Sequence, residues 1–180
     1  MSSSSTPAPT DSPAPADLTT ERLVLRSWTS QEAAAVLEGS RSTRWADDFP
    51  AEGDRVIAGL FGERPAWFDA YGHRLVVERG SGLVVGSIGL FWPPGEGVVG
   101  IGYGIVASRR GRGYATEATR ALAEFALTAV EVHTVSADVE GANPASVRVL
   151  EKAGFQRWAG PESADQPARF RLTGQDCVRR

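Results

Sequence analysis

The residue spacing with the clearest chemical meaning lies between positions 98 and 117. A β-branched apolar run, predicted as a strand, ends in Arg109-Arg110-Gly111-Arg112-Gly113, and an amphipathic helical pattern follows from Tyr114. The first amides of a helix have no partner within the helix and carry the positive end of its dipole, while glycines let the backbone approach a ligand closely. A basic glycine turn between a strand and a helix therefore predicts an anion site, and phosphate is the anion that we expect.

Two common phosphate-binding motifs do not fit this segment. A P-loop needs Lys and then Ser or Thr after its last glycine, but Tyr and Ala follow Gly113. Gly95, Gly97 and Gly100 spell GxGxxG, yet that fingerprint follows a strand and opens a helix, whereas here two prolines precede it and the strand IGYGIV follows. A nucleotide-phosphate binder stays as an alternative, which stabilisation by NAD or ATP would reveal.

Length and composition indicate one globular domain. The chain has 180 residues, 42% of them apolar, and a net charge of −3, which disfavours nucleic acid and membrane surfaces as partners. One cysteine and two histidines cannot form a disulfide or a Cys/His metal site, so we expect a metal-free, cytoplasmic protein. We predict a disordered tail over 1–17, rich in Ser, Pro and Ala, a single domain over 18–176 and a short tail over 177–180.

Hydrophobic periodicity and turn residues place the elements that must position the anion site. The predicted strands are 23–25, 74–79, 83–91, 98–107, 134–139, 155–158 and 169–172. The predicted helices run from the Ser30 cap to Glu38, from Asp54 to Phe61, from Tyr114 to Thr128 and from the Asn143 cap to Gly154. From Gln175 onward we expect a fraying terminus. A run of strands followed by βαβ units predicts an α/β (α+β) fold with a mixed, mostly antiparallel sheet and helices on both faces.

Three motifs, in this order, resemble the ribosomal-protein-alanine (RimJ/RimL-like) branch of the GNAT superfamily of N-acetyltransferases. They are Thr20-Glu21-Arg22-Leu23-Val24-Leu25-Arg26, then Ile101-Gly102-Tyr103 with Arg110-Gly111-Arg112-Gly113-Tyr114-Ala115-Thr116-Glu117-Ala118, and finally Asn143-x-x-Ser146 with Leu150-Glu151-Lys152-x-Gly154-Phe155. The resemblance spans about residues 18–174. It implies a seven-stranded GNAT sheet whose central strands splay apart, with acetyl-CoA as co-substrate in the resulting cleft.

The resemblance also implies which residues contact acetyl-CoA. Pantetheine amides pair with the central strand, and the loop amides hold the pyrophosphate with added charge from two arginines. The implied cofactor-binding residues are Ile105, Val106, Ala107, Arg110, Gly111, Arg112, Gly113, Tyr114, Ala115, Thr116, Asn143 and Lys152. Solvent exposure is the alternative for the arginines, and helix capping is the alternative for Asn143.

Acetyl transfer to an amine needs a neutral nucleophile, a stabilised oxyanion and a proton for the thiolate. Backbone N–H groups from Tyr103 to Ile105 can stabilise the oxyanion, a donor of this kind being worth about 3 to 4 kcal/mol. The resemblance places Ser146 close to the thiol as a proton donor, and Tyr103 is the second candidate. Water is the alternative donor for Ser146, and core packing is the alternative role of Tyr103.

Position 100 departs from the family pattern. Family members often carry Glu immediately before the Ile-Gly-Tyr triplet, where it acts as a general base through water, and this chain has Gly100. Deprotonating a lysine at pH 7 costs about 4 to 5 kcal/mol, but an α-amine near pKa 8 costs only about 1 to 1.4 kcal/mol. The missing base therefore favours an α-amine or another low-pKa amine, unless Glu96, Asp48 or Glu78 supplies the carboxylate.

The acceptor pocket is expected from the irregular segment 41–70 and the strand ends. The predicted substrate-binding residues are Trp28, Trp45, Asp48 and Trp92, with ordinary core packing as the alternative for each tryptophan. No nucleophile is paired with a base, so direct attack in a ternary complex is predicted rather than a covalent intermediate. The leading hypothesis is an N-acetyltransferase acting on a primary amine, either a protein N-terminus or a small molecule. An acyl-CoA-binding module with little turnover is the alternative, and a homodimer is left open.

Overall fold

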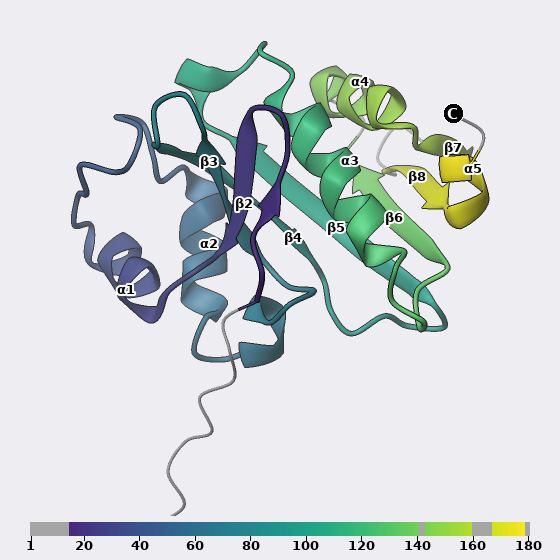
Figure 1. Cartoon of the computed structure of the whole chain (residues 1–180), viewed down its shortest axis with the longest axis horizontal. Coiled ribbons are helices and arrows are strands. Elements are labelled where there is room, and N and C mark those ends of the chain that lie inside the picture. The colour runs from purple at the N-terminus through teal and green to yellow at the C-terminus, as the bar shows by residue number, and fades with distance from the viewer. Residues whose placement is uncertain (1–14, 141–142, 160–166, 179–180) are drawn as a thin grey trace, which may run out of the picture.

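The computed structural model describes residues 15–140, 143–159 and 167–178. Its strands form one sheet in the order β1-β2-β3-β4-β5-β6-β8-β7 (Figure 1). The strands are β1 (Leu18–Thr19), β2 (Leu23–Ser27), β3 (Arg74–Glu78), β4 (Val84–Leu90), β5 (Val98–Ile105), β6 (Thr134–Val139), β7 (Gln156–Ala159) and β8 (Ala168–Thr173). All neighbours are antiparallel except β5 and β6. The mixed, mostly antiparallel sheet is as predicted, and the eighth strand is the two-residue β1.

Helices cover both faces of this sheet, as expected. They are α1 (Ser30–Glu38), α2 (Glu52–Leu60), α3 (Tyr114–Ala126), α4 (Pro144–Ala153) and α5 (Gly174–Val178), with short 3-10 turns η1 (Pro65–Phe68) and η2 (Ala107–Arg109). In Figure 1, α3 lies in front of the sheet and α2 behind it. The helix α3 packs against α4 and β5, and α1 packs against α2. Within the described ranges, no helix is long and apolar enough to span a membrane.

The core beneath α3 and α4 is apolar and fully buried. Ala118 and Leu122 of α3 and Leu150 of α4 are at most 1% exposed, as are Val99 of β5 and Val135 of β6. Burying a side chain the size of Leu stabilises the fold by about 1.5 to 3 kcal/mol. This packing fixes the starts of α3 and α4 relative to the end of β5.

Two helix boundaries follow from caps. Helix α4 begins at Pro144 after Asn143, whose side chain accepts a hydrogen bond from the Ser146 N–H at 3.1 Å, and ends at Gly154 in the left-handed conformation. Both signals were predicted. Helix α1 is capped by Thr29, which forms a capping box with Glu32, so the prediction that Ser30 is the cap was wrong.

The chain end also differs from expectation. Residues 174–178 form α5, not a fraying terminus. The Asp176 carboxylate accepts hydrogen bonds from the Thr173 N–H at 2.9 Å, from the Thr173 hydroxyl at 2.6 Å and from Gln156 on β7 at 3.0 Å. A side chain that bridges back to an earlier strand therefore stabilises a helix too short to be predicted from periodicity.

The parting of β5 and β6 is the feature that creates the site. These parallel strands pair only through Val98 with Thr134, Val99 with Val135 and Gly100 with Ser136. Beyond these pairs β5 continues to Ile105 and β6 to Val139 without further pairing between the two. The predicted splay of the central strands is confirmed.

The buried His73 makes the stability of the fold dependent on pH. His73 is 2% exposed beside Trp67, Phe68 and Phe91, and burial lowers its pKa from 6.5 to about 4. Because the unfolded chain binds this proton more readily, the contribution of neutral His73 is complete above pH 6.5 and declines as the pH falls toward 4. We expect wild type to lose about 2 kcal/mol more unfolding free energy than His73→Gln between pH 7 and pH 5. Urea unfolding at the two pH values measures this, and equal losses would contradict it.

Candidate active site

A cavity of about 460 Å³ opens where β5 ends and where α3 and α4 begin. Its lining comprises Tyr103, Gly104, Ile105, Arg109, Arg110, Gly111, Gly113, Tyr114, Ala115, Thr116, Asn143, Ala145, Ser146, Arg148, Val149 and Lys152. A second cavity, of about 230 Å³, lies between β5 and β6 and shares Tyr103, Asn143 and Ser146 with the first. The predicted anion segment, the splayed strand and the start of α4 therefore meet in one place.

The turn before α3 and the first three residues of that helix, together residues 109–116, are called the anion loop below. Gly111 and Gly113 have φ angles of +73° and +81°, which residues with a Cβ rarely adopt. Glu117 donates the first helical N–H bond, to the Gly113 carbonyl at 3.0 Å, so the preceding amides of Tyr114, Ala115 and Thr116 have no partner within the helix. These three residues line the main cavity, which gives it the amide donors of an anion site.

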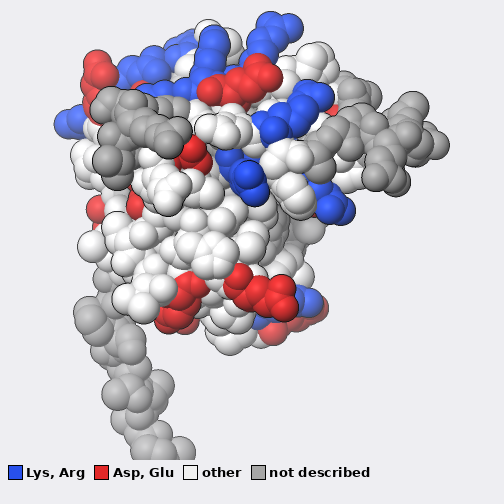
Figure 2. Space-filling view, turned by 90° about the vertical axis from the view of Figure 1, so that its right-hand side faces the viewer, with Lys and Arg blue, Asp and Glu red and all other residues white. Residues whose placement is uncertain are grey.

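Cations surround these amides. Arg109 and Arg110 line the cavity from the anion loop, and Arg148 and Lys152 line it from α4. Figure 2 shows Lys and Arg side chains gathered at the upper end of the molecule, where the loop and the start of α4 lie in Figure 1. The cavity therefore combines amide dipoles with positive side chains, an arrangement that favours a polyanion such as a pyrophosphate.

The open edge of β5 supplies a second set of backbone groups. The Gly100 carbonyl bonds to the Phe91 N–H, and the Val106 N–H bonds to the Val85 carbonyl, both at 2.9 Å. Because hydrogen bonding alternates along an antiparallel pair, the N–H and C=O groups of Tyr103 and Ile105 point away from β4 and toward the gap beside β6. The Ile105 carbonyl accepts a hydrogen bond from Arg110 Nε at 3.0 Å.

Tyr103 and Ser146 lie close together at the junction of the two cavities. The Tyr103 hydroxyl donates to the Ser146 backbone carbonyl at 3.2 Å. Burial raises the pKa of Tyr103, so its phenol is protonated at neutral pH and can donate. The structure thus brings the two predicted catalytic side chains into one place, although their roles remain predictions.

The predicted cofactor contacts divide into two groups. Nine of the twelve line the main cavity, but Val106, Ala107 and Arg112 do not. Val106 is buried with its N–H in the sheet, and Arg112 lies 3.6 Å from the Glu78 carboxylate. Arg148 is a lining residue that the sequence reasoning missed. Its position four residues before Lys152 on α4 was the available signal, since such residues share a helix face.

Two of the three glycines of β5 are covered by one aromatic ring. A Cβ built at Gly100 would lie 2.9 Å from Phe91 Cδ2, and one at Gly102 would lie 3.1 Å from Phe91 Cζ. A Cβ at Gly104 would meet nothing within 4 Å. Phe91 therefore fills the space that a side chain at position 100 would need, so the carboxylate that family members often carry there would not fit beside Phe91 in its present position.

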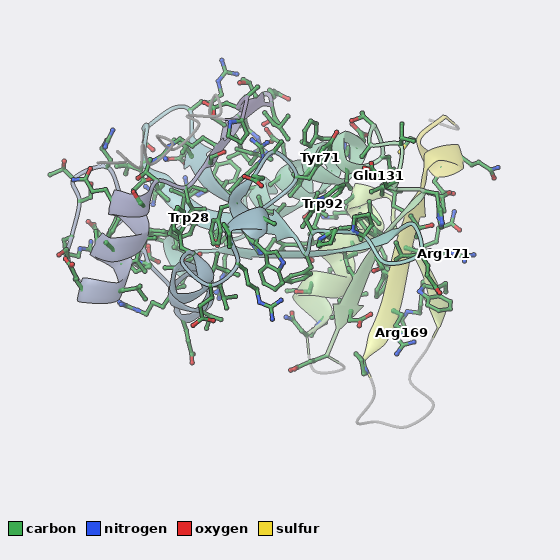
Figure 3. All side chains as sticks on the ribbon, turned by 90° about the horizontal axis from the view of Figure 1, so that it is seen from below. Trp28, Tyr71, Trp92, Glu131, Arg169 and Arg171 are labelled. Carbon is green, nitrogen blue, oxygen red and sulfur yellow. The ribbon has the colours of Figure 1, made fainter. Side chains whose placement is uncertain are left out.

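The predicted acceptor residues lie outside both cavities. Trp28 and Trp45 are at most 5% exposed, and Trp45 packs edge-on against Phe49 with ring centroids 5.2 Å apart. Trp92 stacks on Tyr71 with centroids 4.6 Å apart, well away from Trp28 (Figure 3). Core packing accounts for these tryptophans, and their substrate role stays a prediction.

The three alternative carboxylates lie outside the described cavities, and two of them are engaged by other groups. Asp48 binds the Ser108 N–H at 2.8 Å and its hydroxyl at 2.7 Å, and these bonds lower its pKa. Glu78 accepts hydrogen bonds from Ser81 and from the Tyr114 hydroxyl, which keep its pKa low despite the opposing effect of burial. Glu96 precedes β5, at the end opposite the cavity. None of the three lines a described cavity.

Comparisons with known proteins agree with this geometry. Residues 22–156 match the Acetyltransferase (GNAT) domain. The chain is 31% identical over 119 residues to the probable N-acetyltransferase YjcK of Bacillus subtilis (strain 168), covering 62% of this chain and 63% of that protein. It is 34% identical over 89 residues to the uncharacterized N-acetyltransferase YjdG of the same strain, covering 49% and 51%. The matches thus span between half and two thirds of these relatives.

The structure of AAC(6')-Ib in complex with paromomycin and acetyl-CoA has the same fold. Its TM-score is 0.62 at 23% identity, over 88% of this chain and 97% of that one. Together with the domain match, the splayed sheet and the anion loop, this identifies the class: the chain belongs to the GNAT acetyltransferase family.

The anion loop yields a test with a matched control. Gly111 (φ +73°) lines the cavity and Gly82 (φ +71°) lies in the turn between β3 and β4, and a Cβ at either would meet nothing within 4 Å. Alanine at either position costs about 1 to 2 kcal/mol of unfolding free energy through strain. We expect only Gly111→Ala to weaken CoA binding in calorimetry, by about tenfold or more, because a displaced loop loses charge-assisted hydrogen bonds. Equal CoA affinities for the two variants would refute the assignment.

Proposed function

We propose that this protein transfers the acetyl group of acetyl-CoA to a primary amine. The observation that carries the proposal is the joining of the anion loop to the open edge of β5 in one cavity. The loop amides and the cations line one part of this cavity, and β5 backbone groups that do not pair with β6 line another. These two sets match a ligand that has a pyrophosphate followed by an amide-containing arm.

The residues present fit acetyl-CoA. The amides at the start of α3 and the side chains of Arg110, Arg148 and Lys152 would hold the phosphates. The backbone of Ile105 would pair with the amides of the pantetheine arm, which then enters the gap between β5 and β6. Arg110 donates a hydrogen bond to the Ile105 carbonyl. Cofactor binding would replace this bond with one from a pantetheine amide, and the Arg110 side chain would then be available to bind the phosphates.

The proposed reaction is a direct transfer in a ternary complex. The amine nitrogen attacks the acetyl carbon, and the carbonyl oxygen becomes an oxyanion that the outward N–H of Tyr103 can stabilise, while Ile105 pairs with the pantetheine arm. Attack forms the C–N bond, and collapse of the intermediate re-forms the carbonyl and breaks the C–S bond. The leaving sulfur takes a proton from the Tyr103 or Ser146 hydroxyl, the amine nitrogen loses its extra proton to water, and water returns a proton to that hydroxyl. Cys177 lies on α5, outside the cavity, so no thiol is placed to form an acyl-enzyme.

The acceptor in this proposal is an amine that is substantially neutral at pH 7. Phe91 occupies the volume over Gly100, and Asp48, Glu78 and Glu96 lie away from the cavity. Asp138 and Glu140 line the second cavity and are the carboxylates that could take up the amine proton there. A reaction that uses neither places the cost of forming the neutral amine on the acceptor, and that cost is small for an α-amine. We therefore favour a protein N-terminal α-amine or a small-molecule amine over lysine. The relative AAC(6')-Ib, solved with paromomycin, is consistent with a small-molecule amine.

An amine panel tests the function. The purified protein is incubated with acetyl-CoA and with ribosomal proteins, aminoglycosides, polyamines or peptides, while released thiol and acetylated products are measured. We expect amine-dependent thiol release and a mass gain of about 42 Da, that of one added acetyl group, in one acceptor class. Tight CoA binding without turnover on any amine would instead indicate an acyl-CoA-binding module.

A reaction without an enzyme base has a particular pH dependence. Two matched peptides are compared, one with a free α-amine and one Nα-blocked with a single lysine. The value of kcat/KM should rise with pH and level off when the pH passes the pKa of the acceptor amine, which is about 8 for the first peptide and about 10.4 for the second. At pH 7, kcat/KM should be at least about tenfold higher for the first peptide. A shared pKa near 6 to 7 for both peptides would reveal an enzyme base and overturn this interpretation.

The proton donor can be assigned with two substitutions. Tyr103→Phe and Ser146→Ala each remove one hydroxyl while keeping the shape of the side chain. We expect the variant lacking the donor to lose about 10- to 100-fold in kcat with CoA affinity unchanged within about threefold, because general-acid catalysis contributes about 10²- to 10⁴-fold and water replaces part of it. Stopped-flow thiol release measures kcat, and full activity in both variants would leave water as the donor.

A further inference from the structure

Two segments far apart in the sequence meet behind the anion loop. Glu117, in the first turn of α3, accepts hydrogen bonds at one carboxylate oxygen from the Thr20 hydroxyl at 2.6 Å and the Arg22 N–H at 2.8 Å. Its other oxygen accepts from Arg22 Nε at 2.7 Å. The segment before β2 and the start of α3 are thus joined by three charge-assisted bonds, although neither Arg22 nor Glu117 lines the cavity.

Arg22 also contacts the anion loop itself. Its Nη1 donates to the Arg112 carbonyl at 2.7 Å, and its guanidinium lies over the Tyr114 ring, 5.0 Å from the centroid. A Cβ built at Gly113 would lie 3.2 Å from Arg22 Nη2. One side chain therefore touches three consecutive loop residues while its Nε is held by Glu117.

The backbone that carries Arg22 is itself fixed. The Arg22 carbonyl accepts from the Arg79 N–H at 2.9 Å, and the Arg79 side chain donates to the Thr20 and Glu21 carbonyls at 2.9 and 2.7 Å. The neighbouring Glu78 binds the Tyr114 hydroxyl at 2.7 Å. Hydrogen bonds thereby connect the anion loop to the residues beside β2 and β3, and not to α3 alone.

The charges explain why Glu117 needs its partner. A bare carboxylate in the first turn of α3 would repel a pyrophosphate bound at the same helix end. Burial alone would raise the pKa of Glu117, but the bonds from Thr20 and Arg22 outweigh it and leave the pKa below its ordinary value. Glu117 is thus an anion at neutral pH whose charge is balanced by Arg22. The Arg22 side chain is 44% exposed, so the pair adds little to global stability and its effect falls on the loop.

We propose that Arg22 and Glu117 form a positioning pair that holds the anion loop in the shape that receives the pyrophosphate of acetyl-CoA. The inference rests on the proposed function, because it takes acetyl-CoA as the ligand of the loop. The guanidinium acts through its fork, which engages Glu117 and the Arg112 carbonyl at once. A lysine at this position keeps the charge but cannot reproduce that geometry.

The experiment compares this pair with a second ion pair, whose arginine lies on β2 four residues after Arg22. Arg26 and Glu32 join β2 to α1 with Nη2 and Oε1 2.5 Å apart, remote from the loop. The variants are Arg22→Met, Arg22→Lys, Glu117→Gln, the double Arg22→Met/Glu117→Gln and the control Arg26→Met. Each is assayed with acetyl-CoA and with S-acetyl-pantetheine, which lacks the pyrophosphate, while calorimetry measures CoA affinity and thermal unfolding measures folding.

We expect Arg22→Met to raise the KM for acetyl-CoA and the Kd for CoA about tenfold, which corresponds to about 1.4 kcal/mol. The value of kcat, and kcat/KM for S-acetyl-pantetheine, should stay within about twofold. Arg22→Lys should fail to restore affinity. The double variant should bind CoA no worse than Arg22→Met, because removing the unbalanced carboxylate relieves repulsion. Arg26→Met should bind CoA like wild type.

Three results would overturn the proposal. The first is wild-type CoA affinity in Arg22→Met. The second is wild-type affinity in Arg22→Lys, which would leave charge alone as the cause, and the third is an equal loss of kcat/KM with both thioesters, which would indicate general destabilisation. Wild-type protein that does not bind CoA would contradict the proposed function instead, so the two failures are distinguishable.

Discussion

Backbone hydrogen bonds that the fold leaves unmade are the constraint on which this protein depends. Beyond Gly100 and Ser136, β5 and β6 no longer pair, and the strand groups of Tyr103 and Ile105 face the gap. At the end of the same strand, glycines with positive φ turn the chain into α3 and leave its first amides facing the cavity. Buried backbone groups without partners are costly, so both sets favour a ligand that can bond to them. The packing of α3 and α4 keeps the two sets at a fixed separation.

Local sequence signals predicted those parts of the fold whose causes are local. The alternation of residues 134–139 gave β6 its observed bounds, and Asn143, Pro144 and Gly154 marked α4 because each fixes a backbone conformation by itself. Short elements such as β1 and α5 were missed or misjudged. The Asp176 bonds that stabilise α5 reach a strand about twenty residues away, and no short-range pattern encodes that contact.

The same distinction applies to the site. The anion loop was evident because its glycines and arginines are consecutive, and most of its predicted contacts line the cavity. The groups that support the loop were not evident. Glu117 stood in a family motif without a predicted role, and Glu78 was a candidate base, because their partners Arg22 and Tyr114 are far away in the sequence. Phe91 over Gly100 is a further case, since a glycine shows that space is needed but not which side chain fills it.

The bond between Arg110 and the Ile105 carbonyl links the two halves of the site. The arginine that donates to this strand carbonyl is also a candidate phosphate contact. Arrival of the cofactor would then exchange one internal bond for two external ones: the carbonyl gains an amide and the guanidinium gains an anion. The thioester arm and the phosphates would consequently bind as a coupled unit, so a ligand fragment carrying only one of them would realise less than its share of the affinity.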